Sequence, residues 1–227
     1  MTMRIDKILV VAERASGSQA ALQKAVMIAR HFGAAIELFT CDAEHAYALG
    51  DDIESAAIVT RCLEESRRFL EALRGSISAR DVDFTTAVAC AATVGEGVCE
   101  HVQTSAPSLV VKSFTDAGVA PSPLPSITDL YLMRRCPVPL LLTHGRSWRP
   151  VPKIGVAFGG SVPSARTLRA AAEHLAEGCH GKVDTIETQR TSDVDVLALR
   201  VDGSELAEQI VGTSDCDLLL VPDLADG

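Results

Sequence analysis

The chain has 227 residues, of which 47% are hydrophobic and 22% charged, and its formal net charge is -9. This composition is typical of a globular protein with room for one large domain or two small ones. The negative charge and the lack of a Lys/Arg cluster argue against nucleic-acid or anionic-membrane partners, because phosphate groups attract clustered cations. The sequence contains no run of about 18 apolar residues, so it predicts no membrane span. The amino terminus lacks a signal-peptide pattern, so we expect a cytoplasmic protein.

The first 143 residues alternate between apolar segments of strand length and amphipathic segments of helix length. Strands are predicted at 7–12, 36–40, 82–89, 108–112 and 138–143. Helices are predicted from about 18 to 33, where Gly33 is a typical helix end, and over 54–73, 95–104 and 127–135, the last with Ser126 as its N-cap. Alternating strands and helices indicate right-handed crossovers and an α/β fold with a parallel sheet.

The opening pattern of the chain occurs a second time. Lys7–Val11 returns as Lys153–Ala157, and Ser18–Ala25 returns as Ser164–Ala171, both at an offset of 146 residues (153 − 7 and 164 − 18). A constant offset at two landmarks indicates a duplicated α/β unit. We therefore predict a complete domain over residues 1–144, a linker over 145–152 and a second domain over 153–227.

The second copy is predicted to be shorter than the first. The segment Ser105–Val111, which leads into the fourth strand, matches Ser214–Leu220 at an offset of only 109. The difference of 146 − 109 = 37 residues falls where the first copy has its helix 54–73, and nothing is left to match residues 115–143. We therefore expect a reduced copy without a fifth strand. Its exposed edge at 218–221 would need cover from the first half, the tail or another subunit.

The seven cysteines are odd in number and no two have CxxC spacing, so the sequence predicts neither a disulfide framework nor a metal site. We interpret them as reduced, mostly buried thiols. No Gly-x-Ser-x-Gly nucleophile motif and no helical His pair is present. We therefore expect no catalytic residues, no metal and no cofactor.

Three patterns together resemble the universal stress protein family: Lys7–Val11, the spacing Ser18-x3-Leu22-x2-Ala25, and the Cys-Pro-Val-Pro ending within Arg134–Leu142. The resemblance covers nearly the whole chain and is similar to the tandem-domain members. It implies an open doubly wound parallel sheet of the adenine nucleotide alpha hydrolase type, with strand order 3-2-1-4-5 and a last strand used for dimer pairing. It also implies a stress-induced cytoplasmic factor, from either a branch that binds ATP or one that does not.

The ATP-binding branch carries G-x2-G-x9-G-[S/T] after the fourth strand, where backbone amides and a helix amino terminus can hold phosphate. Counting back from the Cys-Pro-Val-Pro landmark places these four positions on Ser113, Asp116, Ser126 and Ile127, and all four differ from the motif. The ribose-contacting acidic position falls on Glu13, which is longer than the usual Asp. The resemblance therefore points to the branch that does not bind ATP.

Doubly wound folds bind ligands at the carboxyl ends of their strands. The crevice candidates of this chain are, accordingly, Glu13, Thr40, Lys112, Ser113 and Ser126. Lys112 could meet an anion there or reach solvent. We expect a non-catalytic regulator that acts through an unknown protein partner or a small ligand, as a homodimer paired through residues 138–143. The alternative is an ATP- or AMP-binding, weakly hydrolysing member with a rearranged phosphate loop.

Overall fold

The computed structural model describes residues 4–14, 18–45, 53–114, 125–157, 162–186, 193–201 and 214–222. Within these ranges the strands are β1 (Lys7–Val11), β2 (Ala35–Asp42), β3 (Phe84–Cys90), β4 (Leu109–Ser113), β5 (Leu140–Thr143), β6 (Lys153–Ala157), β7 (Lys182–Ile186), β8 (Val196–Val201) and β9 (Asp217–Pro222). The helices are α1 (Ser18–Phe32), α2 (Ile53–Gly75), α3 (Val94–Ser105), α4 (Ile127–Arg135) and α5 (Val162–Cys179).

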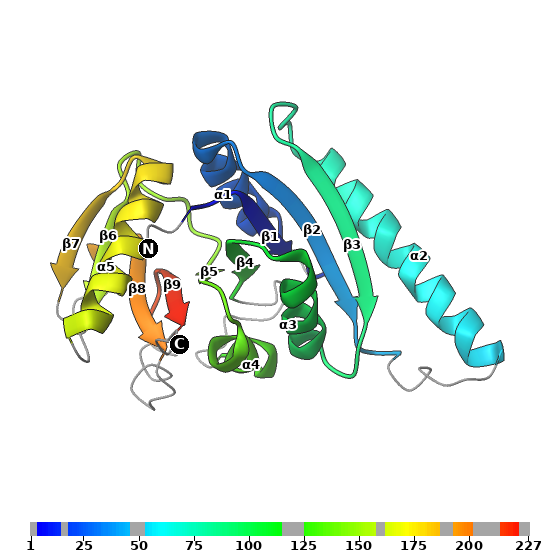
Figure 1. Ribbon diagram of the computed structural model, residues 1–227. Coiled ribbons are helices and arrows are strands. Elements are labelled where there is room, and N and C mark those ends of the chain that lie inside the picture. The colour runs from blue at the N-terminus through cyan, green and yellow to red at the C-terminus, as the bar shows by residue number, and fades with distance from the viewer. Residues whose placement is uncertain are drawn as a thin grey trace.

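The described strands form one continuous sheet in the order β3-β2-β1-β4-β5-β9-β8-β6-β7 (Figure 1). The first five strands are parallel and have the predicted order 3-2-1-4-5. Most residues of β1, β2 and β4 are buried. This agrees with their Val/Ile/Leu-rich sequences, which are typical of strands covered on both faces. The α/β fold class is therefore confirmed.

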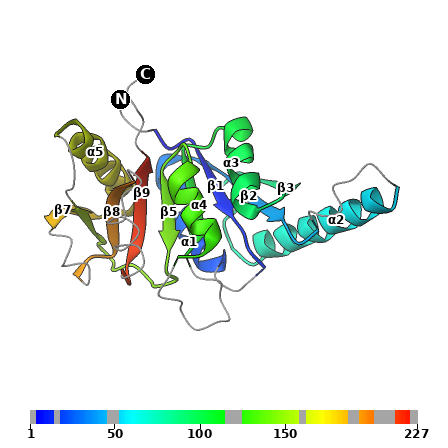
Figure 2. The same ribbon diagram turned by 90° about the horizontal axis from the view of Figure 1, so that it is seen from below.

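Helices cover the two faces of the sheet unequally. On one face, α1, α2 and α5 pack over a core that includes Leu22, Leu70 and Leu175. On the other face, α3 and α4 pack over a core that includes Val98 and Leu132. In both ribbon views α2 runs along β3 and projects beyond the edge of the sheet (Figures 1 and 2).

The second half differs from its sequence prediction in one strand. β8 pairs with β6 as β4 pairs with β1, with Ile154 opposite Val196 where Ile8 lies opposite Leu109. β9 then lies beside β8, in the position that β5 has in the first half. The prediction that 214–220 is the fourth strand and that a fifth is missing is therefore wrong. Both β8 and β9 are apolar segments that follow a Ser-Asp pair in the sequence. The sequence alone therefore did not show which of them is the fourth strand.

The strand predicted to pair with a second copy pairs within the chain instead. β5 and β9 are antiparallel neighbours, with Leu140 opposite Leu220 and Leu142 opposite Leu218. The hydrogen-bonding edge of β5 is occupied in this way, so the prediction of a homodimer through residues 138–143 is wrong. The edge at 218–221 is therefore covered by the first half, one of the three covers that the sequence left open.

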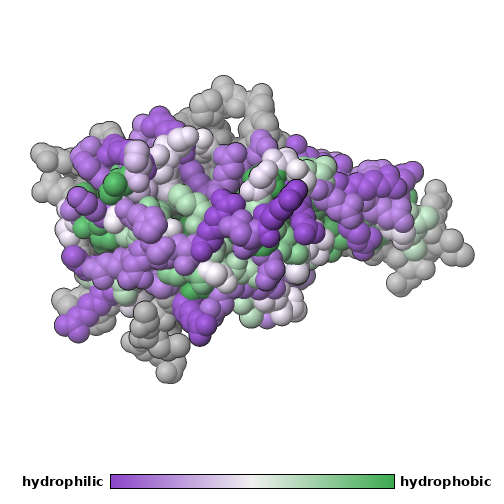
Figure 3. Space-filling view, turned by 90° about the horizontal axis from the view of Figure 1, so that it is seen from above, coloured by the Kyte–Doolittle hydropathy of each residue, from purple (hydrophilic) through white to green (hydrophobic). Residues whose placement is uncertain are grey.

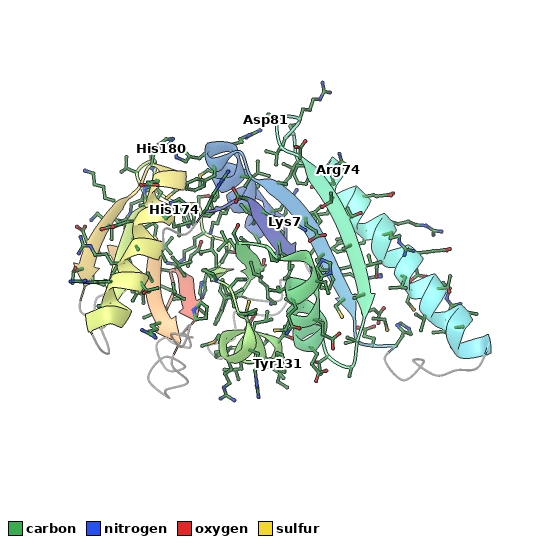
Figure 4. All side chains as sticks on the ribbon, in the orientation of Figure 1. Lys7, Arg74, Asp81, Tyr131, His174 and His180 are labelled. Atoms are coloured by element: carbon green, nitrogen blue, oxygen red, sulfur yellow. The ribbon has the colours of Figure 1, made fainter. Side chains whose placement is uncertain are left out.

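The two halves also meet on the face of the sheet that α1, α2 and α5 cover, where α1 packs against α5. The Phe32 and His174 rings lie 4.5 Å apart between their centroids, and those of His31 and His180 lie 5.1 Å apart. Figure 4 labels His174 and His180 on the α5 side of this contact. The two halves are therefore joined through a strand pair and a helix pair.

All seven cysteines lie in the described residues, and all are free thiols. Burial raises the pKa of Cys136 and that of Cys216 to about 12, which keeps both thiols protonated at neutral pH. The face of the molecule shown in Figure 3 is mostly hydrophilic, with small apolar areas between. No helix in the described ranges has both the length and the apolar character needed to cross a membrane.

Candidate functional site

The strand order reverses between β1 and β4, and this switch point is where doubly wound folds bind ligands. The chain leaves β1 toward α1 on one face of the sheet and leaves β4 toward α4 on the other. Two of the predicted candidates, Glu13 and Lys112, follow or end these two strands. Their side chains are therefore at the position where a family ligand is expected.

Lys112 is fully buried at the switch point and is surrounded by oxygen atoms. Its Nζ lies 3.0 Å from Asp129 Oδ1 and 3.1 Å from Glu13 Oε1, and it donates a 2.8 Å hydrogen bond to the Ser113 carbonyl. Its side chain is only 1% exposed. A buried ammonium requires such partners, because desolvation of an unpaired charge is very costly. The Lys112 ammonium, for which an external anion or solvent was considered, is thus bound by groups of the chain itself.

Asp129 is the partner that places this ion pair at the start of α4. Ser126 Oγ accepts a hydrogen bond from the Asp129 amide at 3.1 Å, and the Asp129 carboxylate accepts one from the Ser126 amide at 3.2 Å. These reciprocal bonds form a capping box, which confirms Ser126 as the N-cap. The Asp129 side chain is fully buried. A helix amino terminus favours negative charge, and here an internal carboxylate supplies it.

We call Lys112, Glu13, Asp129 and Ser126 the Lys112 cluster. Burial by itself lowers the pKa of the Lys112 ammonium, but the charges and hydrogen bonds of Asp129 and Glu13 outweigh it and hold that pKa above its ordinary value. One ammonium and two carboxylates give the cluster a net charge of −1. An approaching phosphate would therefore meet net repulsion in a poorly solvated site.

The side chains of the other two candidates, Thr40 and Ser113, do not join this cluster. Thr40 follows Leu38 on the face covered by α1 and α2, and Ser113 follows Val111 on that same face. Lys112 lies on the opposite face with Val110, toward α4. Strand alternation therefore separates the five candidates into two groups. Asp116, another position of the family motif, lies outside the described residues.

Sequence reasoning missed Asp129, although a signal for it was present. Ser126-x-x-Asp129 is a capping-box pattern, which places the carboxylate at the helix amino terminus. Its approach to Lys112 depends on how α4 packs on the sheet, and no local pattern gives that information.

A second, partly buried group of charged side chains lies near the amino end of β1. Lys7 Nζ is 2.9 Å from Glu37 Oε2, and His101 Nε2 is 3.1 Å from the same oxygen; Lys7 is labelled in Figure 4. Burial of Glu37 raises its pKa, but the hydrogen bonds from Lys7, Ser105 and His101 outweigh that and lower it. Because doubly wound folds place ligands at the opposite ends of the strands, we interpret this group as structural.

A cavity of about 290 Å³ lies at the junction of the halves, between α1 and residues 145–152. Two of its lining side chains, Lys24 and Trp148, bind Asp217 of β9: Asp217 pairs with Lys24 and accepts hydrogen bonds from Trp148 Nε1 at 2.7 Å and the His144 amide at 2.8 Å. Asp217 is 1% exposed. Its contacts link β9 to α1 and to the segment after β5, so the junction cavity is bordered by groups that bind one another.

Comparison with known proteins gives a consistent result. The model of the universal stress protein family matches residues 4–144. A solved structure of a functionally unknown protein from Pseudomonas aeruginosa PAO1 superposes with a TM-score of 0.70 at 18% identity, covering 97% of this chain and 94% of that one. A universal stress protein from Archaeoglobus fulgidus DSM 4304 gives 0.65 at 11% identity, with 96% and 99% covered. At such identities the likeness concerns the fold alone. No curated protein sequence matches the chain.

Proposed function

Because the chain belongs to the universal stress protein family, we propose that it is a non-catalytic stress-response regulator of the branch that does not bind ATP. It acts in the cytoplasm through contacts with another protein. The observation that carries this proposal is the Asp129 carboxylate, which occupies the amino terminus of α4 and binds buried Lys112 at 3.0 Å. That helix terminus is the one that follows β4, where the family motif would hold phosphate.

The energetics of the Lys112 cluster support this proposal. A phosphate that used Lys112 or the Ser126 amide would have to displace the Asp129 carboxylate from that group. Separating a buried ion pair costs about 3–5 kcal/mol when one charge is left without a partner. Binding at 1 μM corresponds to about 8 kcal/mol in total, so this displacement would take a large share of it. The substituted glycine positions at Ser113 and Ser126 leave few replacement contacts.

The surface available to a partner follows from the sheet. The edge of β5 is paired with β9, so the outermost described strands are β3 and β7. Both strands have exposed residues, including Thr85 and Thr86 on β3 and Lys182 and Asp184 on β7. A partner protein, or a second copy of the chain, would pair at one of these edges or bind a helical face. Size-exclusion chromatography with light scattering determines whether a second copy does so.

Isothermal titration with ATP and with AMP, each with Mg²⁺, tests the proposal. We expect no saturable heat with the wild-type protein at micromolar concentration. Saturable micromolar binding that is lost in Lys112→Met or Glu13→Ala would contradict it and support the nucleotide-binding alternative. Lys182→Met is the matched control, because Lys182 is an exposed lysine on the outer strand β7. Any nucleotide heat that persists equally in all variants would come from outside the Lys112 cluster.

A further inference from the structure

We propose that Asp42, His45 and Cys62 form a binding site for a divalent transition metal ion such as Zn²⁺, with Cys90 as the fourth ligand. The site is independent of the Lys112 cluster. Asp42 lies two residues after Thr40 on the face of the sheet that α1 and α2 cover, whereas Lys112 faces α4. Neither the family resemblance nor the proposed regulatory function assigns a role to these residues.

The ligand atoms are already close together. One carboxylate oxygen of Asp42, one ring nitrogen of His45 and the Sγ of Cys62 all lie within 4.8 Å of one another. His45 Nδ1 lies 3.1 Å from Asp42 Oδ1. Tetrahedral zinc with bonds of about 2.0–2.3 Å holds its ligand atoms roughly 3.3–3.8 Å apart. Small side-chain rotations would therefore bring the three donors to the spacing that the metal requires.

The fold holds each donor in place. Asp42 ends β2, and its Oδ1 accepts a 3.0 Å hydrogen bond from the His45 amide, which fixes the turn after the strand. α2 runs back over the sheet and brings the buried Cys62 onto this turn. Asp42 also lies opposite Cys90 in the β2–β3 register, so these two side chains point to the same face. Three donors thus converge from β2, its turn and α2, and Cys90 of β3 lies on the same face beside them.

The donor types determine which metal would bind. Thiolate and imidazole ligands favour zinc and neighbouring transition metals, whereas calcium and magnesium require oxygen ligands. Cys62 is 3% exposed, and the side chains of Asp42 and His45 are 11% and 32% exposed. The site is thus buried on the Cys62 side and reachable from solvent on the His45 side. This arrangement provides both a shielded metal–sulfur bond and an entry path.

A simpler interpretation is that Asp42 and His45 form an ordinary ion pair with Cys62 as an apolar neighbour. The two interpretations differ in the role of the sulfur atom. Cys41 provides a matched control, since it adjoins Asp42 in sequence but faces the other way. A Cβ at Gly97 of α3 would lie 2.4 Å from its Sγ, which places that thiol against α3.

Titration of the reduced full-length protein with Co²⁺ tests the proposal. We expect one equivalent to give visible tetrahedral cobalt bands and a thiolate-to-metal charge-transfer band, both removed by Zn²⁺. Cys62→Ser should abolish the charge transfer from that sulfur, and His45→Ala and Asp42→Asn should weaken binding at least about tenfold, since even the loss of outer-shell partners costs that much. Cys90→Ser should reduce the charge-transfer intensity, and Cys41→Ser should change nothing.

Three results would overturn the proposal: no cobalt band in the wild-type protein, full retention of the band in Cys62→Ser, or equal loss in Cys41→Ser. An unchanged spectrum in Cys90→Ser would remove that residue from the ligand set. Thermal unfolding of each variant without metal shows whether it is folded. A Zn²⁺-dependent rise in the midpoint, present in the wild type and Cys41→Ser but absent in Cys62→Ser, is the second expected readout.

Discussion

The two halves of the sheet differ in which elements they contain, and they meet through a strand pair and a helix pair. Within the described residues, the first half has five strands and four helices, whereas the second has four strands and one helix. The second half contacts the first mainly through β9 and α5: β9 pairs with β5, α5 packs on α1, and α4 of the first half contacts β9. Four elements of the first half have no described counterpart: α2, β3 and α3, which lie away from this junction, and α4, which contacts β9. The second half thus resembles a built-in partner for the first.

The charged groups at the switch point and at the junction of the halves also differ in what they connect. In the Lys112 cluster, one ammonium binds two carboxylates within the first half. At the junction, the Asp217 carboxylate of the second half binds Lys24, Trp148 and the His144 amide of the segments before it. We infer that the Lys112 cluster stabilises one half, whereas Asp217 stabilises the union of both. Variants at the two sites can separate these roles.

The largest effect is expected in the first half, for Lys112→Met. Two carboxylates would remain at the switch point without their cation, and Asp129 is fully buried. Leaving a buried charge without its partner costs about 3–5 kcal/mol. Urea unfolding measures this loss. A change below 1 kcal/mol would mean that the Lys112 cluster does not hold the switch point together.

The next effect is expected at the junction, for Asp217→Asn, which keeps the shape and removes the charge. Lys24 would lose its carboxylate, and we expect a loss of about 2–3 kcal/mol, as for hydrogen bonds to charged groups. Asp215→Asn is the matched control, because Asp215 pairs with Arg146 at an exposed position worth at most about 1 kcal/mol. Equal effects of the two substitutions in urea unfolding would argue against Asp217 as the link between halves.

A smaller effect is expected where α5 packs on α1. A Cβ at Gly178 would lie 2.4 Å from the Phe32 ring, so Gly178→Ala must move that ring away from His174. Overpacking costs typically 1–3 kcal/mol and the helical gain of Ala over Gly returns about 1, so we expect a net loss of about 1 kcal/mol. Gly75→Ala, at the end of α2 with open space around it, should not destabilise the protein. Thermal unfolding compares the two, and a stabilised Gly178→Ala would show that the helix contact is loose.

The smallest effect is a pH dependence at the end of β5. Burial lowers the pKa of His144, which stacks on Phe114 at 4.4 Å, although the Asp217 charge acts in the opposite direction. The unfolded chain then binds a proton more readily than the folded one, so stability falls as pH decreases from about 6.5 through the folded pKa. Unfolding midpoints measured from pH 7.5 to 5 should fall less in His144→Phe than in the wild type. Parallel curves would show that His144 does not contribute.

Much of the fold was predictable because it rests on local patterns. The strand order of the first half, the Ser126 cap and the buried thiols follow from periodicity, capping chemistry and the family resemblance. The position of β9 did not, because Val194–Ala198 and Cys216–Leu220 are both apolar runs that could serve as a fourth strand. Only pairing across the sheet, which is a long-range property, assigned each run to its place.

The candidate site was predicted in part for the same reason. Glu13 and Lys112 were found because both stand at the carboxyl ends of strands that the sequence identified. Asp129 and the Asp42–His45–Cys62 group were missed, since their neighbours come from helices whose packing on the sheet no local pattern reveals. Short-range motif searches for metal ligands look for close spacing, whereas Cys62 comes from α2 rather than from the turn that holds His45.

Hydrogen exchange of the β5 amides, measured over a wide range of protein concentration, tests most directly whether the second half acts as a built-in partner. Pairing with β9 of the same chain predicts that Leu140–Leu142 stay protected to the same degree at every concentration. Protection that decreases on dilution would mean that a second copy covers this edge, and it would contradict the account.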